Sequence, residues 1–349
     1  MKKIDGTPWI KLFFLFGAAL LIGGCATVDK PKTRVLWPPP PNPPKLEWIG
    51  TYSSLDQMPK TGAEKMAAPF LGGQPEPVFK RPFGIASSGD GRIFVSDADI
   101  RQITVYDLNK RSVYPFKNTG AVRSAFGMAV DSGGRLYVAD AVGQSVLVFG
   151  PDDAPLLSIG GPELLEHPTF VALDEARDRV YVSDARANRI AVFDMKGKHL
   201  RSFGEWGPQD GNFYSPQGMA VDKNGNLYVA DMFNARVQVF DADGKFLRKF
   251  GERGDLQSNF EMPKGVAIDS AGNLHITDAR KGAMLTYNAE GRLLLFTGGG
   301  NPGHPLSLVL PAGIWVDKKD QIYVVDQIGR RFAIWQYLNA EYLKEHPIE

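Results

Sequence analysis

Short segments with alternating apolar and polar residues recur along most of this chain, and six of them end in aspartate. The aspartates stand at intervals of 43 to 48 residues, at Asp97, Asp140, Asp184, Asp231, Asp278 and Asp326. Alternation with a period of two indicates β-strands, and no helical periodicity separates them. A strand-based repeat of this length is typical of a β-propeller, in which each repeat forms one sheet, or blade. The pattern therefore predicts an all-β, six-bladed propeller.

The fourth repeat shows the expected unit most clearly. Residues 216–222 form its first predicted strand, and Asn224-Gly225 turns the chain into a second strand at 226–231. Asn-Gly suits such a turn because a two-residue hairpin needs positive φ angles. Residues 236–241 and 245–251 give the third and fourth strands. Each blade is therefore predicted to be a four-stranded antiparallel meander.

The sixth repeat lacks a fourth strand, because a short polar tail at 338–349 follows its third predicted strand. An open sheet edge would leave backbone donors and acceptors unpaired. Residues 45–53 form an isolated predicted strand ahead of the repeats, which span 79–337. We expect this N-terminal strand to complete the last blade, so that the propeller comprises residues 45–337.

The recurring motifs carry a family resemblance. Pro-x-Gly followed by Ala-Val/Ile-Asp, then Gly-Asn-Leu-Tyr-Val-Ala-Asp and Arg-Val-Gln-Val-Phe-Asp, resembles the NHL repeat, which forms six-bladed propellers. The likeness covers roughly residues 80–337. It is strongest in the fourth and fifth repeats and weaker in the first, second and sixth, where Ser88, Ala125 and Arg331-Phe332 depart from the pattern.

The N-terminus predicts a lipid anchor. Basic residues precede an uncharged stretch at 12–22, and Gly23-Gly24-Cys25 follows, which is typical of a cleaved signal peptide at 1–24. The stretch is too short for a membrane-spanning helix, which needs about 20 apolar residues. Cys25 is the only cysteine and stands where the bacterial lipoprotein motif places the acylated residue. The alternative is an ordinary signal peptide with an accidental cysteine.

The resemblance to bacterial lipoproteins implies a place in the cell envelope. Ala26, rather than Asp, follows the cysteine, which favours the outer membrane if the cell is Gram-negative. Residues 25–44 would form a lipidated N-terminus and a proline-rich linker, since dense proline favours an extended, semi-rigid spacer. The lipid membrane is thus one expected partner.

Charge and motifs restrict the other partners. The net charge of +1 provides no basic field for phosphates, so we expect no nucleic-acid binding. No nucleophile elbow, zinc-protease motif, phosphate loop or haem-attachment motif is present, and we expect no cofactor.

Loops on one face of the ring are the expected binding surface. The loops after second strands and the long connections between blades share that face, and variable loops on a rigid frame commonly carry function. Aromatic and arginine side chains dominate binding hot spots. The candidates are Arg186, Trp206, Tyr214, Phe233, Arg236 and Arg280. Each has a structural alternative, because aromatics can join neighbouring blades and an arginine can pair with the strand-ending aspartate.

A channel enzyme is the competing hypothesis. Some six-bladed propellers are metal-dependent lyases or lactonases, and in the related amidating lyases histidines occupy the middle of the Pro-x-Gly motif. Here those positions are Phe83, Phe126, Thr169, Gln217, Lys264 and Ala312, none of which is a zinc ligand. His167 and His304 are the weak remaining metal candidates.

We therefore predict a lipid-anchored propeller that acts as a non-catalytic binding or scaffold module, for another envelope protein or a glycan. The alternative is a metal-dependent lyase or hydrolase, lactonase-like, with its site in the central channel. The six strand-ending aspartates are expected to bind backbone groups rather than substrate.

Overall fold

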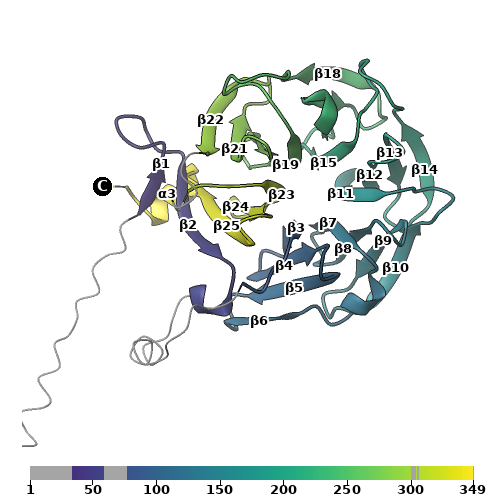
Figure 1. The fold of residues 1–349 in the computed structure, drawn as a ribbon, viewed down its shortest axis with the longest axis horizontal. Coiled ribbons are helices and arrows are strands. Elements are labelled where there is room, and N and C mark those ends of the chain that lie inside the picture. The colour runs from purple at the N-terminus through teal and green to yellow at the C-terminus, as the bar shows by residue number, and fades with distance from the viewer. Residues whose placement is uncertain (1–33, 59–76, 300–303, 305, 349) are drawn as a thin grey trace, which may run out of the picture. The chain divides into compact units, whose positions relative to one another are not determined.

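The structure is a computed structural model that describes residues 34–58, 77–299, 304 and 306–348. The expected signal peptide at 1–24 and Cys25 lie outside the described residues. Within the described part, the chain forms six antiparallel sheets around a central axis (Figure 1). The predicted six-bladed, all-β architecture is confirmed.

The first five blades each contain four strands in sequence order. Blade 1 holds β3 (Pro82–Ser87), β4 (Arg92–Asp97), β5 (Gln102–Asp107) and β6 (Ser112–Pro115), and blade 2 holds β7 (Ala125–Val130), β8 (Leu136–Asp140), β9 (Ser145–Phe149) and β10 (Pro155–Gly160). Blade 3 holds β11 (Pro168–Asp174), β12 (Arg179–Asp184), β13 (Arg189–Phe193) and β14 (His199–Phe203). Blade 4 holds β15 (Pro216–Val221), β16 (Leu227–Asp231), β17 (Arg236–Phe240) and β18 (Phe246–Phe250). Blade 5 holds β19 (Pro263–Ile268), β20 (Leu274–Asp278), β21 (Ala283–Tyr287) and β22 (Leu293–Gly298).

Short helical turns occur between strands, at η1 (Leu55–Gln57), η2 (Thr119–Ala121), η3 (Glu175–Arg177) and η4 (Met232–Asn234). None of the helices in the described ranges is long and apolar enough to cross a membrane.

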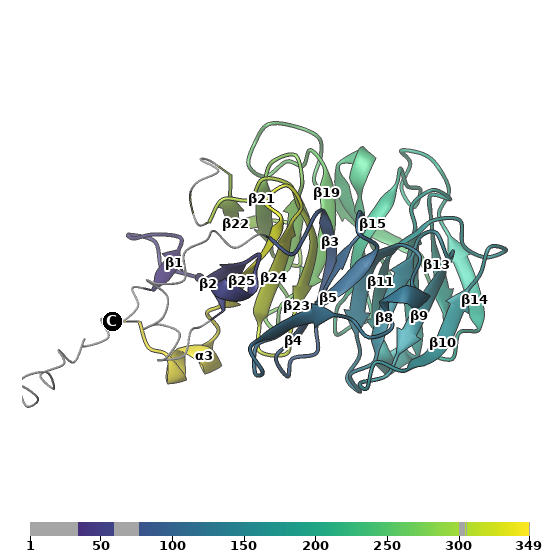
Figure 2. The ribbon, with the colours of Figure 1, turned by 60° about the horizontal axis from the view of Figure 1, so that its bottom comes forward.

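The strands run between two faces of the ring, as the side view shows (Figure 2). Because neighbouring strands are antiparallel, the tight turns after first and third strands lie on one face, which we call the hairpin face. The loops after second strands and the connections between blades lie on the other, the long-loop face. First strands are innermost and line the central channel (Figure 1).

Each strand-ending aspartate holds the connection through which the chain enters its blade from the preceding one. Asp184, for example, accepts hydrogen bonds from the backbone N–H groups of Glu166 and His167, both at 2.8 Å. All six aspartates are buried, with at most 1% of their surface exposed, and each accepts at least one such N–H bond from the connection that enters its own blade. The prediction that they bind backbone groups is confirmed.

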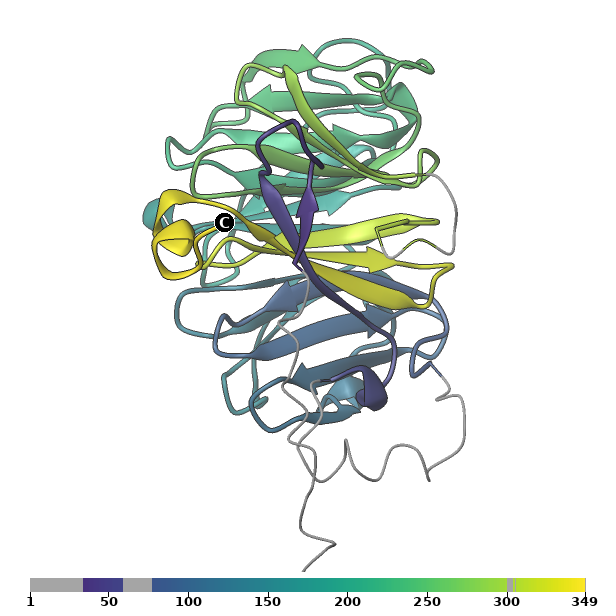
Figure 3. The same ribbon diagram turned by 90° about the vertical axis from the view of Figure 1, so that its left-hand side faces the viewer.

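The last blade is closed by the N-terminal segment, as predicted. Its strands β23 (Pro311–Val316), β24 (Gln321–Asp326) and β25 (Arg331–Tyr337) are completed by β2 (Leu46–Tyr52), which pairs antiparallel with β25 (Figure 3). Leu46 lies opposite Tyr337, and Tyr52 lies opposite Phe332. The ring is therefore held shut by pairing between the two ends of the chain.

The predicted linker at 25–44 needs a correction. Residues 35–37 form a further strand, β1 (Val35–Trp37), which pairs with β2 and gives the last blade five strands. The Trp37 indole donates to the Phe296 carbonyl oxygen on blade 5 at 3.0 Å. The proline-rich run is the loop between β1 and β2 rather than an extended spacer, because the apolar Val-Leu-Trp segment gains both backbone pairing and burial beside blade 5.

The C-terminal tail also belongs partly to the ring. Leu338 is buried, and its N–H donates to the carbonyl oxygen of Lys45 at 2.9 Å. A short helix follows, α3 (Ala340–Glu345), in which the Asn339 side chain caps the backbone N–H of Tyr342.

Candidate functional site

Three exposed aromatic side chains lie together on the long-loop face. Trp206, Tyr214 and Phe233 are 66%, 46% and 42% exposed. The ring centres of Trp206 and Tyr214 are 6.3 Å apart, and those of Tyr214 and Phe233 are 4.9 Å apart. We call these three residues the aromatic patch. The structure thus brings together three of the side chains that sequence analysis placed on this face.

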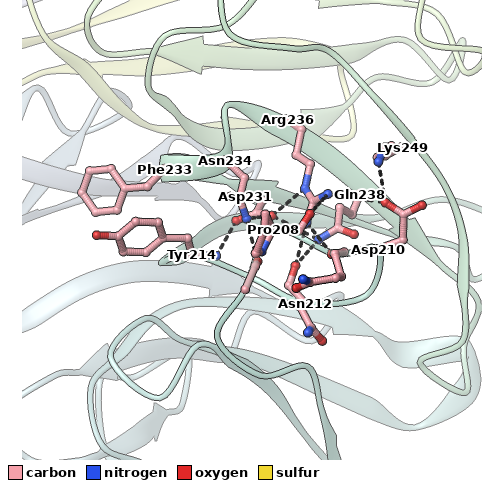
Figure 4. Close-up of polar contacts among 12 residues, drawn as sticks. Pro208, Asp210, Asn212, Tyr214, Asp231, Phe233, Asn234, Arg236, Gln238 and Lys249 are labelled. Carbon is pink, nitrogen blue, oxygen red and sulfur yellow. Dashed lines mark hydrogen bonds and ion pairs between the residues drawn. The ribbon is translucent and has the colours of Figure 1, made fainter.

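The fourth candidate from this region, Arg236, lies beneath the surface. It is only 5% exposed, and its Nε donates to the Asp231 carboxylate at 2.8 Å (Figure 4). Its two terminal nitrogens donate to three carbonyl oxygens of one loop, those of Pro208, Gln209 and Asn212, each at 2.8 Å. The prediction that Arg236 contributes to the binding face is therefore wrong, because all of these guanidinium hydrogen bonds go to Asp231 and to the loop that carries Trp206.

Asp231 is the centre of this network. Besides Arg236, it accepts hydrogen bonds from the Tyr214 backbone at 2.8 Å and from the Asn234 and Gln238 side-chain amides at 2.8 and 3.1 Å. Burial nevertheless raises the pKa of this carboxyl above its ordinary value. The bonds position both loops of the patch, so the aromatic rings stand on a rigid base.

Arg186 and Arg280 belong to blades 3 and 5, the neighbours of blade 4. They follow the strand-ending aspartates of blades 3 and 5 by two residues, as Phe233 does in blade 4. Their side chains are 67% and 70% exposed and form ion pairs with Glu166 at 3.8 Å and Glu261 at 3.1 Å. Both arginines therefore remain on the same face as the aromatic patch.

Sequence analysis missed Arg253 as a neighbour of the patch. Its guanidinium donates to the Phe233 carbonyl oxygen at 2.8 Å. The signal was available in the repeat, because Gly-Glu-Arg-Gly at 251–254 matches Gly-Glu-Trp-Gly at 204–207. Trp206 and Arg253 each form the same isolated bridge with a phenylalanine seven residues later. The two loops are thus equivalent, and one presents an indole where the other presents a cation.

The two histidine candidates take part in local contacts. The His167 ring lies edge-on to Phe126, with centres 5.5 Å apart, and its pKa is lowered by burial and by nearby Arg186. Nδ1 of His304 accepts the N–H of Leu306 at 3.2 Å. Within the described ranges, no group of three or more His, Cys, Asp or Glu side chains is placed to hold a metal ion.

Aromatic rings fill the channel at its long-loop end. The ring centre of Phe83 is 4.7 Å from that of Phe126 and 5.4 Å from that of Phe170, and Ala312 completes the cluster. Phe170 stands where the other five first strands have glycine. We call Phe83, Phe126 and Phe170 the channel plug. All three side chains are apolar, and two of them, Phe83 and Phe126, occupy the middle positions of the Pro-x-Gly motif.

Lys264 lies beside the plug. Its Nζ is 5.8 Å from the Phe83 ring centre and donates to the Gln327 side-chain oxygen at 3.1 Å. Burial, together with the positive charge of Arg81, lowers the pKa of this amine to about 8. The ammonium form is therefore destabilised in the folded protein.

Replacing Lys264 with methionine should stabilise the protein at neutral pH, by about 1–2 kcal/mol after allowance for solvent screening. Between pH 8 and the ordinary lysine pKa of 10.5, the unfolded chain keeps a proton that the folded chain has lost. Wild-type stability therefore rises with pH through this window, and the advantage of Lys264→Met should shrink. Urea unfolding at pH 7 and pH 9.5 measures both effects. An advantage equal at both pH values would contradict the assignment.

Comparison with known proteins supports the fold and only the fold. A profile described as the SMP-30/gluconolactonase/LRE-like region matches residues 162–253, and a profile described as a 6-bladed beta-propeller matches residues 222–296. Neither is the NHL repeat, which stays a resemblance. No curated protein matches the chain.

Several solved structures have a similar fold at low sequence identity. A gluconolactonase from Xanthomonas campestris is 16% identical, with a TM-score of 0.58, covering 74% of this chain and 86% of that one. A catalytically inactive virginiamycin B lyase from Staphylococcus aureus, with quinupristin, is 11% identical, with a TM-score of 0.54 and coverage of 74% and 95%. A chain of a nidogen/laminin complex is 19% identical, with a TM-score of 0.52 and coverage of 73% and 92%. Enzymes and a protein complex thus share this architecture.

Proposed function

We propose that this protein is a cell-envelope lipoprotein, anchored through acylated Cys25, whose propeller is a non-catalytic docking module for another envelope protein. The observation that carries the proposal is the aromatic patch, three exposed rings held on loops that the buried Arg236–Asp231 pair fixes. Large apolar rings are costly to leave in water unless a partner covers them. A rigid base lowers the ordering cost when that partner binds.

The surroundings of the patch favour a protein partner over a glycan. Arg186 and Arg280 are exposed on the adjoining blades, and each pairs with a glutamate at the surface. Aromatic residues and arginine are the residue types that supply most binding energy at protein interfaces. The patch would form the apolar centre of the interface, and these ion pairs its polar rim.

A channel lyase or hydrolase is the second candidate, favoured by the match of residues 162–253 to the gluconolactonase-like profile. The channel plug argues against it, because phenylalanine at Phe83, Phe126 and Phe170 offers no metal ligand, acid or base. A stoichiometric divalent ion in the purified protein would favour the enzyme.

Crosslinking in intact envelopes tests the docking surface. Trp206→Ala combined with Phe233→Ala should reduce the crosslinked partner about tenfold or more, because two adjacent hot-spot rings are lost. Both side chains are exposed, so the melting temperature should change little. The matched control is Leu156→Ala, which removes a 57% exposed apolar side chain from the outer strand of blade 2.

The expected pattern is a loss with the double variant and none with the control. Equal yields from wild type, double variant and control would show that the partner binds elsewhere.

A further inference from the structure

One row of side chains in blade 5 departs from the repeat on the flank that faces blade 6. In blades 3 and 4 the same row, read from the second strand to the fourth, is tyrosine, valine and arginine. In blade 5 it is His275, Thr286 and Leu295, which lie opposite one another on β20, β21 and β22. The tyrosine and arginine positions of the row therefore both hold shorter side chains in blade 5.

The arginine of this row bridges to the next blade where it is present. Nη2 of Arg201 in blade 3 donates to the carbonyl oxygen of Ala242, in a turn of blade 4, at 3.1 Å. Arg248 in blade 4 donates in the same way to the carbonyl oxygen of Ala289 in blade 5. Leu295 has no donor for such a bond, so the row of blade 5 leaves space on its flank.

That space is a groove of about 910 Å³ along the outer strand of blade 5. One wall is β22, with Leu294, Leu295 and Phe296, and the other is the N-terminal segment, with Trp37 and Pro43 (Figure 3). More of the accessible lining is apolar than polar. Leu294 is 47% exposed, so the groove opens at the outer rim of the ring.

The polar side chains of the row are paired with one another at the floor of the groove. The two ring nitrogens of His275 lie 3.0 Å from the Thr286 hydroxyl oxygen and 3.1 Å from the Asp269 carboxylate. His275 and Thr286 are both buried. They therefore shape the floor, and any polar contact with a ligand has to come from the rim.

The rim carries one positive charge. Asn42, Lys45 and Gln257 line the groove with exposed side chains. Among the described residues that line it, none is Asp or Glu. The Lys45 ammonium forms no ion pair with any other residue in the described part of the chain. The groove thus combines apolar walls with a cation that is not neutralised, which favours an anionic ligand.

We propose that this groove binds a fatty acid, with its acyl chain along β22 and its carboxylate at Lys45. The six residues of β22 span about 20 Å. An extended acyl chain spans about 15 Å, half the hydrocarbon thickness of a bilayer. The volume lies within the usual range for ligand pockets, about 300–1,000 Å³, and apolar walls with a few polar groups are typical of them.

The groove is separate from the aromatic patch. It lies on the outer flank of blade 5, whereas the patch lies on loops of blade 4 at the long-loop face. Fatty-acid binding is therefore a function beyond partner docking, and neither depends on the other.

Filling the groove tests its place in the ring. Titration calorimetry of the full chain at pH 8 measures binding of decanoate, which is ionised there. Leu295→Trp adds bulk to the wall and should weaken binding at least tenfold. Leu157→Trp is the matched control, because Leu157 occupies the equivalent position in blade 2, opposite Val148. It should leave decanoate binding unchanged.

The charge is tested with 1-decanol, which has the same chain as decanoate and no anionic group. Lys45→Gln should weaken decanoate binding about three- to fivefold, the range for an exposed ion pair, and should leave 1-decanol binding unchanged. The proposal is overturned if decanoate does not bind, or if Leu295→Trp binds it as tightly as wild type. It is also overturned if Lys45→Gln affects both probes equally. Because Lys45 is exposed, this comparison decides alone should Leu295→Trp not fold.

Discussion

A chain that begins at Ser53, and therefore lacks β1 and β2, should fail to form a soluble, cooperatively folding ring. Removing β2 exposes the whole edge of β25, to which it is paired from Leu46 to Tyr52. The buried side chains of Leu46 and Tyr52 are lost, including the stacking of Tyr52 on Phe332 at 5.2 Å. Each such side chain is worth about 1.5–3 kcal/mol, and the strand pairing adds to this. The total approaches the entire stability of a typical domain, about 5–15 kcal/mol.

Size-exclusion chromatography and thermal melting monitored by circular dichroism measure the outcome. We expect aggregation through the exposed β25 edge or a broad, low-temperature transition. Two matched truncations serve as controls. A chain beginning at Arg34 keeps both strands and should melt like the full chain, and one beginning at Lys45 loses only β1 and should be intermediate. A monomeric Ser53 chain with an unchanged melting temperature would disprove closure by β2.

Replacing Arg236 with leucine should destabilise the protein by about 3–5 kcal/mol, the usual cost of removing one partner from a buried ion pair. The change leaves Asp231 buried without its cation and removes the Arg236 donor from the carbonyl oxygens of Pro208 and Gln209, whereas that of Asn212 keeps the Gln238 side-chain amide. Urea unfolding at pH 7 measures the loss. Arg280→Leu is the control, because that side chain is 70% exposed and its removal should cost less than about 0.5 kcal/mol.

The pH dependence of Arg236→Leu has a defined sign. Burial already raises the pKa of Asp231, and loss of the cation raises it further. A folded-state pKa above the unfolded value means that stability falls as pH rises through it. The defect should therefore be smaller near pH 4, about the unfolded pKa of aspartate, than at pH 7. Asp231→Asn added to Arg236→Leu should recover part of the loss at pH 7, and no recovery would argue against an uncompensated charge.

Much of the fold could be predicted because the same strand pattern recurs in all six repeats. In each repeat, the strand pattern, the turn residues and the spaced aspartate indicated the same arrangement of strands. Blade 6 lacked a fourth strand in its own repeat, and residues 45–53 were correctly predicted to supply it. β1 was not predicted, because three apolar residues ahead of a proline run are too few to show the alternation typical of a strand. Its pairing with β2 and the contact of Trp37 with blade 5 exist only once the ring has formed.

The candidate site was predictable to a lesser extent. Trp206, Tyr214 and Phe233 could be placed on one face from strand direction alone, and they form a single patch. Arg236 looked equivalent to the exposed arginines in the sequence. Its burial depends on a loop from residues 204–215 folding over it, which strand order does not reveal.

The sequence by itself determined the number of blades, the strand order and the face on which each loop lies, because these follow from local alternation and from a repeated spacing. Only the tertiary structure decided which side chains are exposed and what fills the channel. Phe170 and Trp315 are single departures from the repeat, and both line the same part of the channel although they come from different blades. Local sequence patterns determine the order and number of the strands, whereas contacts between segments distant in the sequence determine which side chains are exposed.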